Sequence, residues 1–365
     1  MAGIISYVAK HSHSQTKVVQ ELKRRILSGG FPPGSRLSTQ VELAEICGAC
    51  HVTVQRAVDR LRENGFVETR GRHGTYVAKH PPHLSRFGIV FPSYAKTPET
   101  CDNQFIIAWH KEATRYFAEG AEGRIVSFFY KTAGHDAPEC CADLLEEVEA
   151  DHLAGLIFTT PPYEFERTAL FSDAGIPKVG LLARPLPGTT QIVPDSYIGT
   201  VLDHLKNRGR RRVAFMMHAA FNPAEKVHEL SSLAQARGMV TYPHWIQGVN
   251  FITPAWAANC ANVIFHCSRD ERPDAFVIMD DNLVPHATAG LLTAGVRVPD
   301  EVDVVAHANF PYPTPSAVPA KRVGYSIRAM LEKSVDIIER RRQGEEVPAE
   351  LHFPPAFDDE IPAQG

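Results

Sequence analysis

The sequence of 365 residues lacks several features that would assign it to other classes of protein. No stretch approaches the roughly 18 consecutive apolar residues of a membrane-spanning helix, so we expect no contact with a membrane. Residues 1–14 contain no apolar segment followed by a small-residue cleavage site, which predicts a cytoplasmic protein. The seven cysteines are odd in number and scattered, so free thiols are expected rather than a disulfide framework.

Signatures of catalysis are also absent from the sequence. It contains no Gly-x-Ser-x-Gly nucleophile elbow, no glycine-rich phosphate loop and no cluster of metal ligands. Asp280 and Asp281 could serve as a carboxylate pair in an α/β enzyme acting on a sugar or nucleoside, but adjacent side chains at a strand end usually point apart. We therefore expect no catalytic residue, no metal site and no cofactor, and the enzyme remains only an alternative.

Charge is distributed unevenly along the chain. The net charge is −4, yet residues 1–86 carry 13 lysines and arginines against 6 acidic residues, whereas the remainder carries 25 against 36. A basic head on an acidic body is typical of a protein whose first part neutralises phosphates while the rest avoids nonspecific contact with nucleic acid. The length is consistent with two or three domains.

Three apolar stripes predict three helices between residues 16 and 64. The first ends at Gly29-Gly30, and the second begins at Thr39-Gln40-Val41-Glu42, a capping box in which Thr39 and Glu42 bond to each other's backbone amides. A three-residue turn, Gly48-Ala49-Cys50, leads to a third stripe, which consists of Val54, Ala57, Val58 and Leu61. Two short helices joined by such a turn predict a helix-turn-helix motif.

A basic hairpin is predicted after the third helix. Residues 66–69 and 75–77 are β-prone, and Arg70-Gly71-Arg72-His73-Gly74 joins them. We therefore predict a flexible tail at residues 1–15 and a winged helix-turn-helix at residues 16–79. Polar side chains outside its apolar stripes can contact phosphates or base edges. The candidates for DNA contact are Arg36, Ser38, Thr39, Gln40, His51, Thr53, Gln55, Arg56, Arg72 and His73.

This part of the chain resembles the GntR family of winged-helix regulators. The resemblance rests on segments such as Pro33-Gly34, Glu42-Leu43-Ala44, Arg56-Ala57-Val58 and Gly74-Thr75-Tyr76-Val77. It implies binding to double-stranded operator DNA. The chain departs from the family pattern at positions that face the bases, because Val41, His51 and Gln55 stand where arginine is common. We therefore expect an operator different from the usual ones of the family.

The turn of the motif also matches a pattern with other chemistry. Cys47-Gly48-Ala49-Cys50-His51 fits covalent haem attachment, and its two thiols have the spacing of zinc ligands. Such haem attachment needs export, and a zinc site needs two further ligands, for which His11 and His13 are the nearest candidates. We interpret Cys47 as a core residue and Cys50 as a residue at the start of the third helix.

From residue 87 onward, apolar strand-like runs alternate with helical segments, after a short stiff linker at residues 80–86. Such alternation predicts an α/β fold with parallel sheets. Two successive series of runs indicate two lobes within residues 87–365, with crossovers near 190–195 and 305–325. Ligands of open α/β sheets bind beyond the carboxyl ends of the strands. The residues at these ends that suit a small polar ligand are Tyr94, Asp195, Asp281, Asn309 and Phe310.

The second part resembles the effector domain of LacI-type regulators, which is similar to the periplasmic sugar-binding fold. The resemblance rests on residues 192–200 and 275–281. It implies a small-molecule effector, a sugar or sugar derivative, bound between the lobes. It aligns Asp281 with the sugar-contacting aspartate and Asp195 with the crossover aspartate. The sugar-binding arginine of the family has no clear counterpart, and Lys226 is its nearest positional substitute. Trp245 is a further candidate for effector contact.

The predicted function is a homodimeric repressor of the arabinose-repressor type, in which a GntR-like head joins a LacI-like body. An effector can control such a repressor only if its affinity differs between two states of the dimer with different distances between the two heads. Besides the enzyme, two alternatives remain: a regulator whose effector domain no longer binds a ligand, and a solute-binding protein, which would need export. The arginine-rich residues 208–212 are interpreted as a solvated loop rather than a second DNA site.

Overall fold

The computed structural model describes residues 2–92, 103–120, 123–131, 141–172, 175–219, 223–250, 252–268 and 270–361, with side chains from residue 15 onward. The chain forms two compact units. The first comprises residues 1–90, 117–189 and 335–347, and the second residues 91–116, 190–334 and 348–365. Among the described helices, none is long and apolar enough to cross a membrane.

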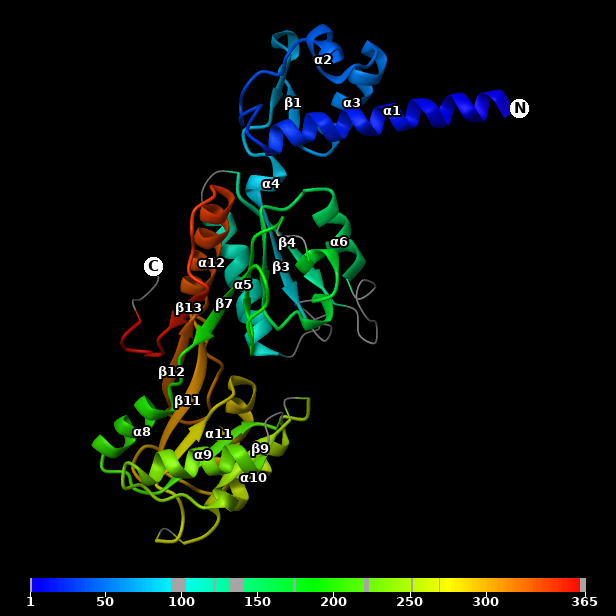
Figure 1. Ribbon diagram of the computed structural model, residues 1–365. Helices are drawn as coiled ribbons and strands as arrows, with labels where there is room; N and C mark the ends of the chain where they lie inside the picture. Colours follow the sequence, from blue (N-terminus) through cyan, green and yellow to red (C-terminus); the bar gives the residue numbers. More distant parts are fainter. Residues whose placement is uncertain are drawn as a thin grey trace. The chain divides into compact units, whose positions relative to one another are not determined.

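The N-terminal head of the first unit is a winged helix-turn-helix, as the sequence predicted (Figure 1). Its elements are α1 (Ala2–Leu27), α2 (Gln40–Cys47), α3 (His51–Glu63), β1 (Val67–Thr69), the short helix η1 (Gly71–His73) and β2 (Thr75–Val77). The predicted apolar stripes meet in one core that includes Leu22, Leu43, Val54, Leu61 and Phe66. Gly48 ends α2 at φ 58°, a left-handed conformation that glycine adopts without strain.

The beginning of α1 differs from the sequence prediction. We expected a flexible tail at residues 1–15, but the helix starts at Ala2. Residues 2–15 contain no proline, and Gly3, their one glycine, lies in the first turn, so nothing in the backbone interrupts the helix.

The segment predicted as a linker is packed rather than extended. Residues 82–85 form the short helix α4 (Pro82–Ser85), in which Pro82 and His83 are buried. The His83 ring stacks on the Phe66 ring of the head, with 5.8 Å between centroids and 16° between planes. Strand β3 then begins at Arg86, so no solvated spacer separates the head from the first strand.

The first unit contains a sheet with the order β4-β3-β5-β6, in which β3, β5 and β6 run parallel. Its strands are β3 (Arg86–Phe91), β4 (Ile125–Tyr130), β5 (Gly155–Phe158) and β6 (Lys178–Leu181). Helices α6 (Ala142–Glu149) and α7 (Ala169–Ser172) contribute to the core on one face. Helix α12 (Ile327–Arg342) passes so close to β5 that a Cβ atom on Gly155 would lie 2.5 Å from Ile338 Cγ2. Glycine at this position therefore permits the helix to pack on the strand.

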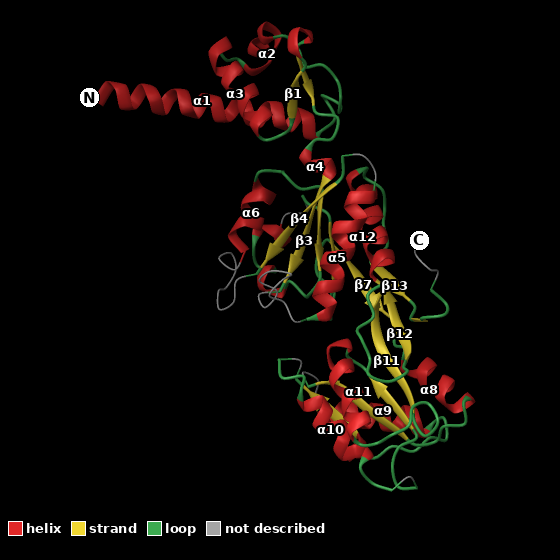
Figure 2. Ribbon diagram, turned by 180° about the vertical axis from the view of Figure 1, so that it is seen from behind, coloured by secondary structure: helices red, strands yellow, loops and turns green. Residues whose placement is uncertain are grey.

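The second unit contains a sheet with the order β9-β8-β10-β11-β12-β14, parallel except for β14. Its strands are β8 (Val213–His218), β9 (Ile246–Val249), β10 (Ala275–Ile278), β11 (Asp303–Phe310), β12 (Lys321–Ser326) and β14 (Ala356–Phe357). The helices around it are α8 (Ile198–Asn207), α9 (Pro223–Gln235), α10 (Trp256–Phe265) and α11 (Val284–Thr293) (Figure 2). Two separate apolar cores, one with α8 and α9 and the other with α10 and α11, cover the two faces of the sheet.

Three further elements complete the fold. Strands β7 (Thr189–Pro194) and β13 (Glu350–Phe353) pair in parallel, and α5 (Gln104–Glu119) belongs mainly to the second unit. The predicted fold class, a winged helix-turn-helix followed by an α/β part with parallel sheets, is therefore confirmed.

Candidate functional site

Helix α3 has one buried face and one exposed face. Thr53, Val54, Ala57, Val58 and Leu61 are buried in the head, which is the stripe that the sequence predicted plus Thr53. On the opposite face His51, Val52 and Arg56 are exposed, and Gln55 is half-buried. Because the first turns of a recognition helix contact base edges, these side chains are the candidates for reading DNA.

Thr53 does not lie on the exposed face, although the sequence predicted that it contacts DNA. Its side chain is buried, and its Oγ1 lies 3.1 Å from Cys50 Sγ, which belongs to the residue that caps α3. This contact, together with backbone amides at the start of the helix, lowers the pKa of the Cys50 thiol. Thr53 therefore organises the beginning of α3 from its inner side.

Gln40 and Gln55 are brought together, and their amide groups are bonded to each other. The Gln40 side chain donates to Gln55 Oε1, and Gln55 Nε2 donates to Asp59 Oδ1 at 3.1 Å. One N–H and one lone pair of the Gln55 amide remain for a base, so a contact of Gln55 with adenine would share the amide with these two partners. The bond between the two glutamines joins the start of α2 to the outer face of α3.

The predicted capping box is present at the start of α2. Glu42 N donates to Thr39 Oγ1 at 3.4 Å, and Thr39 N donates to the Glu42 carboxylate at 2.8 Å. The Thr39 hydroxyl therefore caps the helix. Ser38, the residue before it, is half-buried.

The wing carries the remaining candidates for DNA contact. Arg72 and His73 are exposed at its tip in η1, and a Cβ atom on the next residue, Gly74, would lie 3.1 Å from Arg36 Nε. The structure thus brings the Arg36 side chain to the wing. Arg70 is not free in the same way, because it forms a 2.6 Å ion pair with Glu68 and lies over the Tyr76 ring.

Asp281 and Asn309, two of the predicted effector contacts, meet in the second unit. Asp281 follows β10 and is 3% exposed, and its carboxylate accepts a 2.6 Å hydrogen bond from Asn309 Nδ2. Burial, reinforced by the neighbouring charge of Asp280, raises the pKa of the Asp281 carboxyl to about 7. Asp280 instead accepts bonds from the Asn282 amides at 2.8 and 2.9 Å, so the two carboxylates have separate partners.

Asp195 occupies a different environment from Asp281. Its carboxylate lies 2.9 Å from His352 Nδ1 on β13, and its backbone oxygen accepts a hydrogen bond from the Tyr325 hydroxyl. The bonds with Asp195 and then Glu350 raise the pKa of His352. Asp195 therefore joins β13 and β12 in the second unit.

The other predicted effector contacts have other surroundings. Lys226 lies on α9 and forms a 2.8 Å ion pair with Glu229. Trp245 is 3% exposed in the core with α10, and the centroids of its ring and the Tyr242 ring lie 4.7 Å apart. The residue that the sequence predicted as an effector contact is therefore a core residue. Phe310 is buried beside Asn309, and Tyr94 lies outside the described residues.

Sequence reasoning missed a second polar cluster in this unit. Glu112 on α5 is fully buried, and its carboxylate accepts from the Tyr312 hydroxyl at 2.9 Å and from Arg328 at 3.1 Å. Arg328 also lies over the Tyr116 ring at 5.2 Å. A carboxylate, a guanidinium and aromatic rings are the groups that orient sugars in proteins. The sequence feature that could have revealed Glu112 is its place in an apolar stripe: Trp109 and Ala113 lie on the same buried face of α5.

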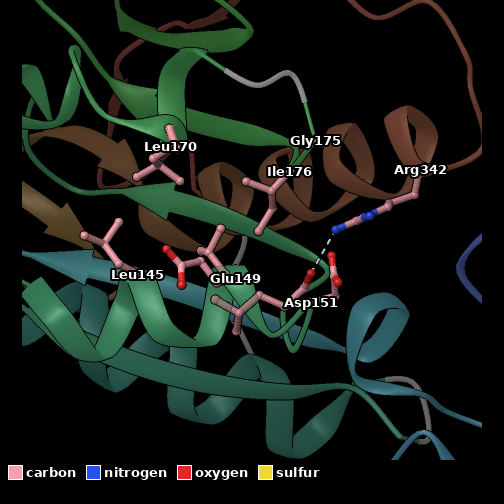
Figure 3. A pocket seen from close by; sticks show the side chains of 10 residues that line it. Leu145, Glu149, Asp151, Leu170, Gly175, Ile176 and Arg342 are labelled. Atoms are coloured by element: carbon pink, nitrogen blue, oxygen red, sulfur yellow. Dashed lines mark hydrogen bonds between the residues drawn. The ribbon is translucent and has the colours of Figure 1, made fainter. Parts of the chain in front are cut away.

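A separate cavity of about 280 Å³ lies in the first unit (Figure 3). Its walls are mostly apolar, including Leu145, Leu170 and Ile176, with Arg342 at one side. Arg342 donates to the backbone oxygens of Leu153 and Ala154 at 2.8 and 2.7 Å. Arg342 therefore stabilises the chain before β5, and the predicted effector contacts do not belong to this lining.

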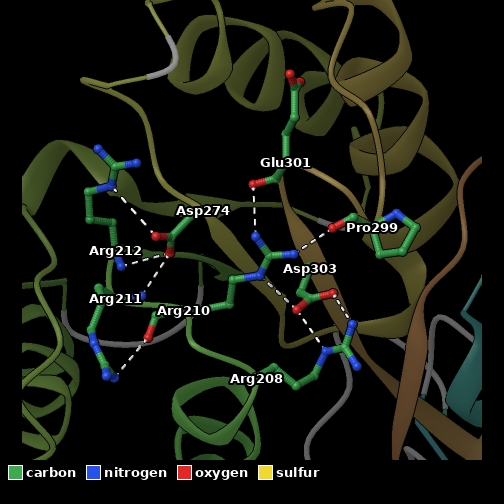
Figure 4. Close-up of polar contacts among 8 residues, drawn as sticks. All are labelled: Arg208, Arg210, Arg211, Arg212, Asp274, Pro299, Glu301 and Asp303. Atoms are coloured by element: carbon green, nitrogen blue, oxygen red, sulfur yellow. Dashed lines mark hydrogen bonds and ion pairs between the residues drawn. The ribbon is translucent and has the colours of Figure 1, made fainter.

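The arginine-rich residues 208–212 are held by carboxylates (Figure 4). Arg208 and Arg210 both bond to Asp303 at 2.8 Å, and Arg212 lies 3.7 Å from Asp274. Arg208, Arg210 and Arg212 therefore have acidic partners within the unit.

In the described residues, no group of three or more His, Cys, Asp or Glu side chains could hold a metal ion. Cys47 is half-buried and Cys50 is exposed.

Two family models match the chain in succession. The model of bacterial regulatory proteins of the gntR family matches residues 14–77, and that of the periplasmic binding protein-like domain matches residues 202–356. The arabinose metabolism transcriptional repressor of Geobacillus stearothermophilus is 23% identical over 354 residues, which cover 88% of this chain and 90% of that protein.

Solved structures resemble about three quarters of the chain in fold. A LacI family regulator from Bifidobacterium animalis subsp. lactis matches with a TM-score of 0.57 at 15% identity, over 75% of this chain and 94% of that one. A LacI family regulator from Lactobacillus casei with bound glucose matches with a TM-score of 0.54 at 18% identity, over 75% and 98%. The likeness extends over almost the whole of both solved chains.

Proposed function

We propose that this chain, a transcriptional regulator that joins a GntR-type helix-turn-helix domain to a periplasmic-binding-protein-like effector domain, is a homodimeric repressor that a small sugar releases from its operator. It acts in the cytoplasm on double-stranded DNA. Binding and release, rather than catalysis, are its function.

One observation carries the proposed DNA contact: the exposed face of α3 and the tip of the wing present basic side chains from the same head. His51 and Arg56 are exposed on α3, and Arg72 and His73 are exposed on the wing. Arginine reads guanine through two hydrogen bonds, and basic wing residues neutralise phosphates. Residues 1–86 also carry the excess of positive charge.

The polar groups of the second unit support a neutral, hydroxyl-rich effector. A sugar hydroxyl both donates and accepts, and the Asp281 carboxyl, whose pKa is raised to about 7, can do the same near neutral pH. The cluster of Glu112, Tyr312 and Arg328 adds charged and aromatic groups in the same unit. The first relative above is named for arabinose metabolism, and one structural neighbour was solved with glucose. We therefore propose a pentose or hexose.

An exposed apolar surface supports the proposed homodimer. On α10, Trp256 is 61% and Val263 is 76% exposed, and Leu292 on α11 is 55% exposed. Trp256 and Val263 line a groove of about 510 Å³, together with Cys260, Ile264 and others. Apolar side chains gathered in this way are typical of a surface that another protein covers. A second copy is the occupant that a palindromic operator requires, because each chain carries one head.

The test uses the full chain and an operator selected from genomic DNA. Binding of the labelled operator is measured with and without arabinose, glucose and related sugars, and the thermal midpoint is measured in parallel. A true effector raises the midpoint, by about 2.7 kcal/mol of stability at a hundred times its dissociation constant, and weakens operator binding.

The variant Asp281→Ala separates the two parts of the proposal. It should bind the operator like the wild type and lose release by the sugar, whereas Asp143→Ala, an exposed aspartate on α6, should retain both. Operator binding without a response to any sugar would favour a regulator whose effector domain has lost its ligand. Absence of any preference for selected DNA would contradict the proposed function itself.

A further inference from the structure

Helix α3 leaves one apolar side chain in solvent. Val52 is 61% exposed, whereas the other apolar side chains of the helix, Val54, Ala57, Val58 and Leu61, are buried. A single exposed valine on a protein surface is ordinary by itself. Its position in the first turn of α3 is what gives it a possible role, because the first turns of such a helix reach the bases.

Val52 lies on the same face of α3 as the polar candidates for base contact. Gln55 and Arg56 follow it at the i+3 and i+4 positions, which a helix places beside one another. His51 precedes it and is also exposed. A duplex that accepts the side chain of Arg56 in its major groove therefore meets the isopropyl group of Val52 as well.

The neighbours of Val52 limit what else can fill this position. Gln55 is bonded at both ends of its amide, to Gln40 and to Asp59. Thr53 is turned inward to Cys50. Thus, on this part of α3, the exposed side chains are His51, Val52 and Arg56, and Val52 is the apolar one among them.

One base carries an apolar group at the floor of the major groove. Thymine has a C5-methyl group there, whereas cytosine, adenine and guanine present only polar edges and C–H groups. We propose that Val52 reads a thymine in each half-site of the operator by packing its isopropyl group on that methyl group. The inference rests on the proposed DNA-binding function and adds to it a specificity-determining residue and the base that it selects.

The test replaces thymine by uracil, which removes the methyl group and keeps the base pairing. Operator duplexes with this change at one position in both half-sites are bound to the full-length chain, and affinity is measured by fluorescence anisotropy at fixed salt. At the position that Val52 contacts, the change from thymine to uracil should weaken binding by the wild type roughly fourfold for each half-site, which is the effect of one buried methyl group. Val52→Ala, which keeps only the Cβ atom of the side chain, should bind the thymine operator less tightly and lose most of the uracil effect at that position.

Val240→Ala is the matched control, because Val240 is also an exposed valine but lies in the second unit rather than in the head. It should keep the full uracil effect at the position that Val52 reads. Val52→Thr, which retains one methyl group, should keep part of the effect. Both Val52 variants should melt at the wild-type temperature, since the side chain is exposed.

Two results distinguish the failure of this inference from that of the proposed function. If selected DNA binds specifically but Val52→Ala keeps the full uracil effect at every thymine, or no thymine shows one, the reading by Val52 is wrong. If the wild type prefers no sequence over competitor DNA, the proposed function fails as well.

Discussion

Asn309 donates a hydrogen bond of 2.6 Å to the Asp281 carboxylate, and both side chains are almost excluded from solvent. Asn309 lies near the end of β11 and Asp281 follows β10, so the bond joins the carboxyl ends of two adjacent parallel strands. The bond favours the ionised carboxylate, whereas burial and Asp280 favour the neutral form and dominate. The carboxyl therefore titrates near neutral pH.

The first prediction concerns stability against pH. The pKa of Asp281 is about 7 in the folded chain against an ordinary value of 3.8. The stability that the protonated carboxyl contributes is therefore fully present below pH 4 and is lost as the pH rises towards 7. Asp281→Asn cannot titrate and keeps an oxygen that accepts from Asn309. The free energy of unfolding of the variant, relative to that of the wild type, should therefore increase between pH 4 and pH 7, by up to roughly 4 kcal/mol. Urea unfolding at several pH values measures this, and a constant difference between the two proteins would contradict it.

The second prediction concerns Arg56. Arg56→Ala should weaken specific operator binding by about 1–3 kcal/mol and relax the preference at one base pair. Arg62→Ala is the control, because Arg62 also lies on α3 but forms a 2.9 Å ion pair with Asp59, and it should change affinity little. Equal losses for Arg56→Ala on operator and on random DNA would instead identify a phosphate contact.

The third prediction concerns the thiols of the turn. The pKa of Cys50 is lowered by Thr53, whereas burial raises the pKa of Cys47, so iodoacetamide should alkylate Cys50 first. Thr53→Val removes the hydroxyl and should move the alkylation of Cys50 to higher pH. Mass spectrometry of the modified peptides measures both rates. Faster labelling of Cys47 would contradict the prediction, and bound operator should slow the labelling of Cys50.

The fourth prediction concerns the exposed surface of α10. Val263→Glu places a charge on the side chain that is 76% exposed there, and should convert a dimer into monomers without unfolding them. Val240→Glu, at a residue outside the groove that is 43% exposed, serves as the control and should remain dimeric. Light scattering at several concentrations distinguishes the two, and a Val263→Glu dimer would show that another surface joins the copies.

Local patterns were sufficient to predict the head. The Thr39 and Glu42 capping box depends on residues three apart, and both bonds are present. The side that Thr53 occupies follows from the same kind of pattern, because Thr53 stands four positions before Ala57 and eight before Leu61 and so lies on the apolar stripe of α3. In the second unit, Glu112 and Arg328 are 216 positions apart, so no local pattern could pair them.

The interleaving of the two units has a consequence for how such a chain can change over generations. Residues 1–90 enter the first unit as one continuous segment, whereas the rest of each unit is assembled from separate segments. A recombination event near residue 80 exchanges the head as a whole and leaves both sheets intact. A crossover inside residues 91–347 divides both units at once, so the effector part is inherited complete or not at all, while the DNA-reading head is exchangeable.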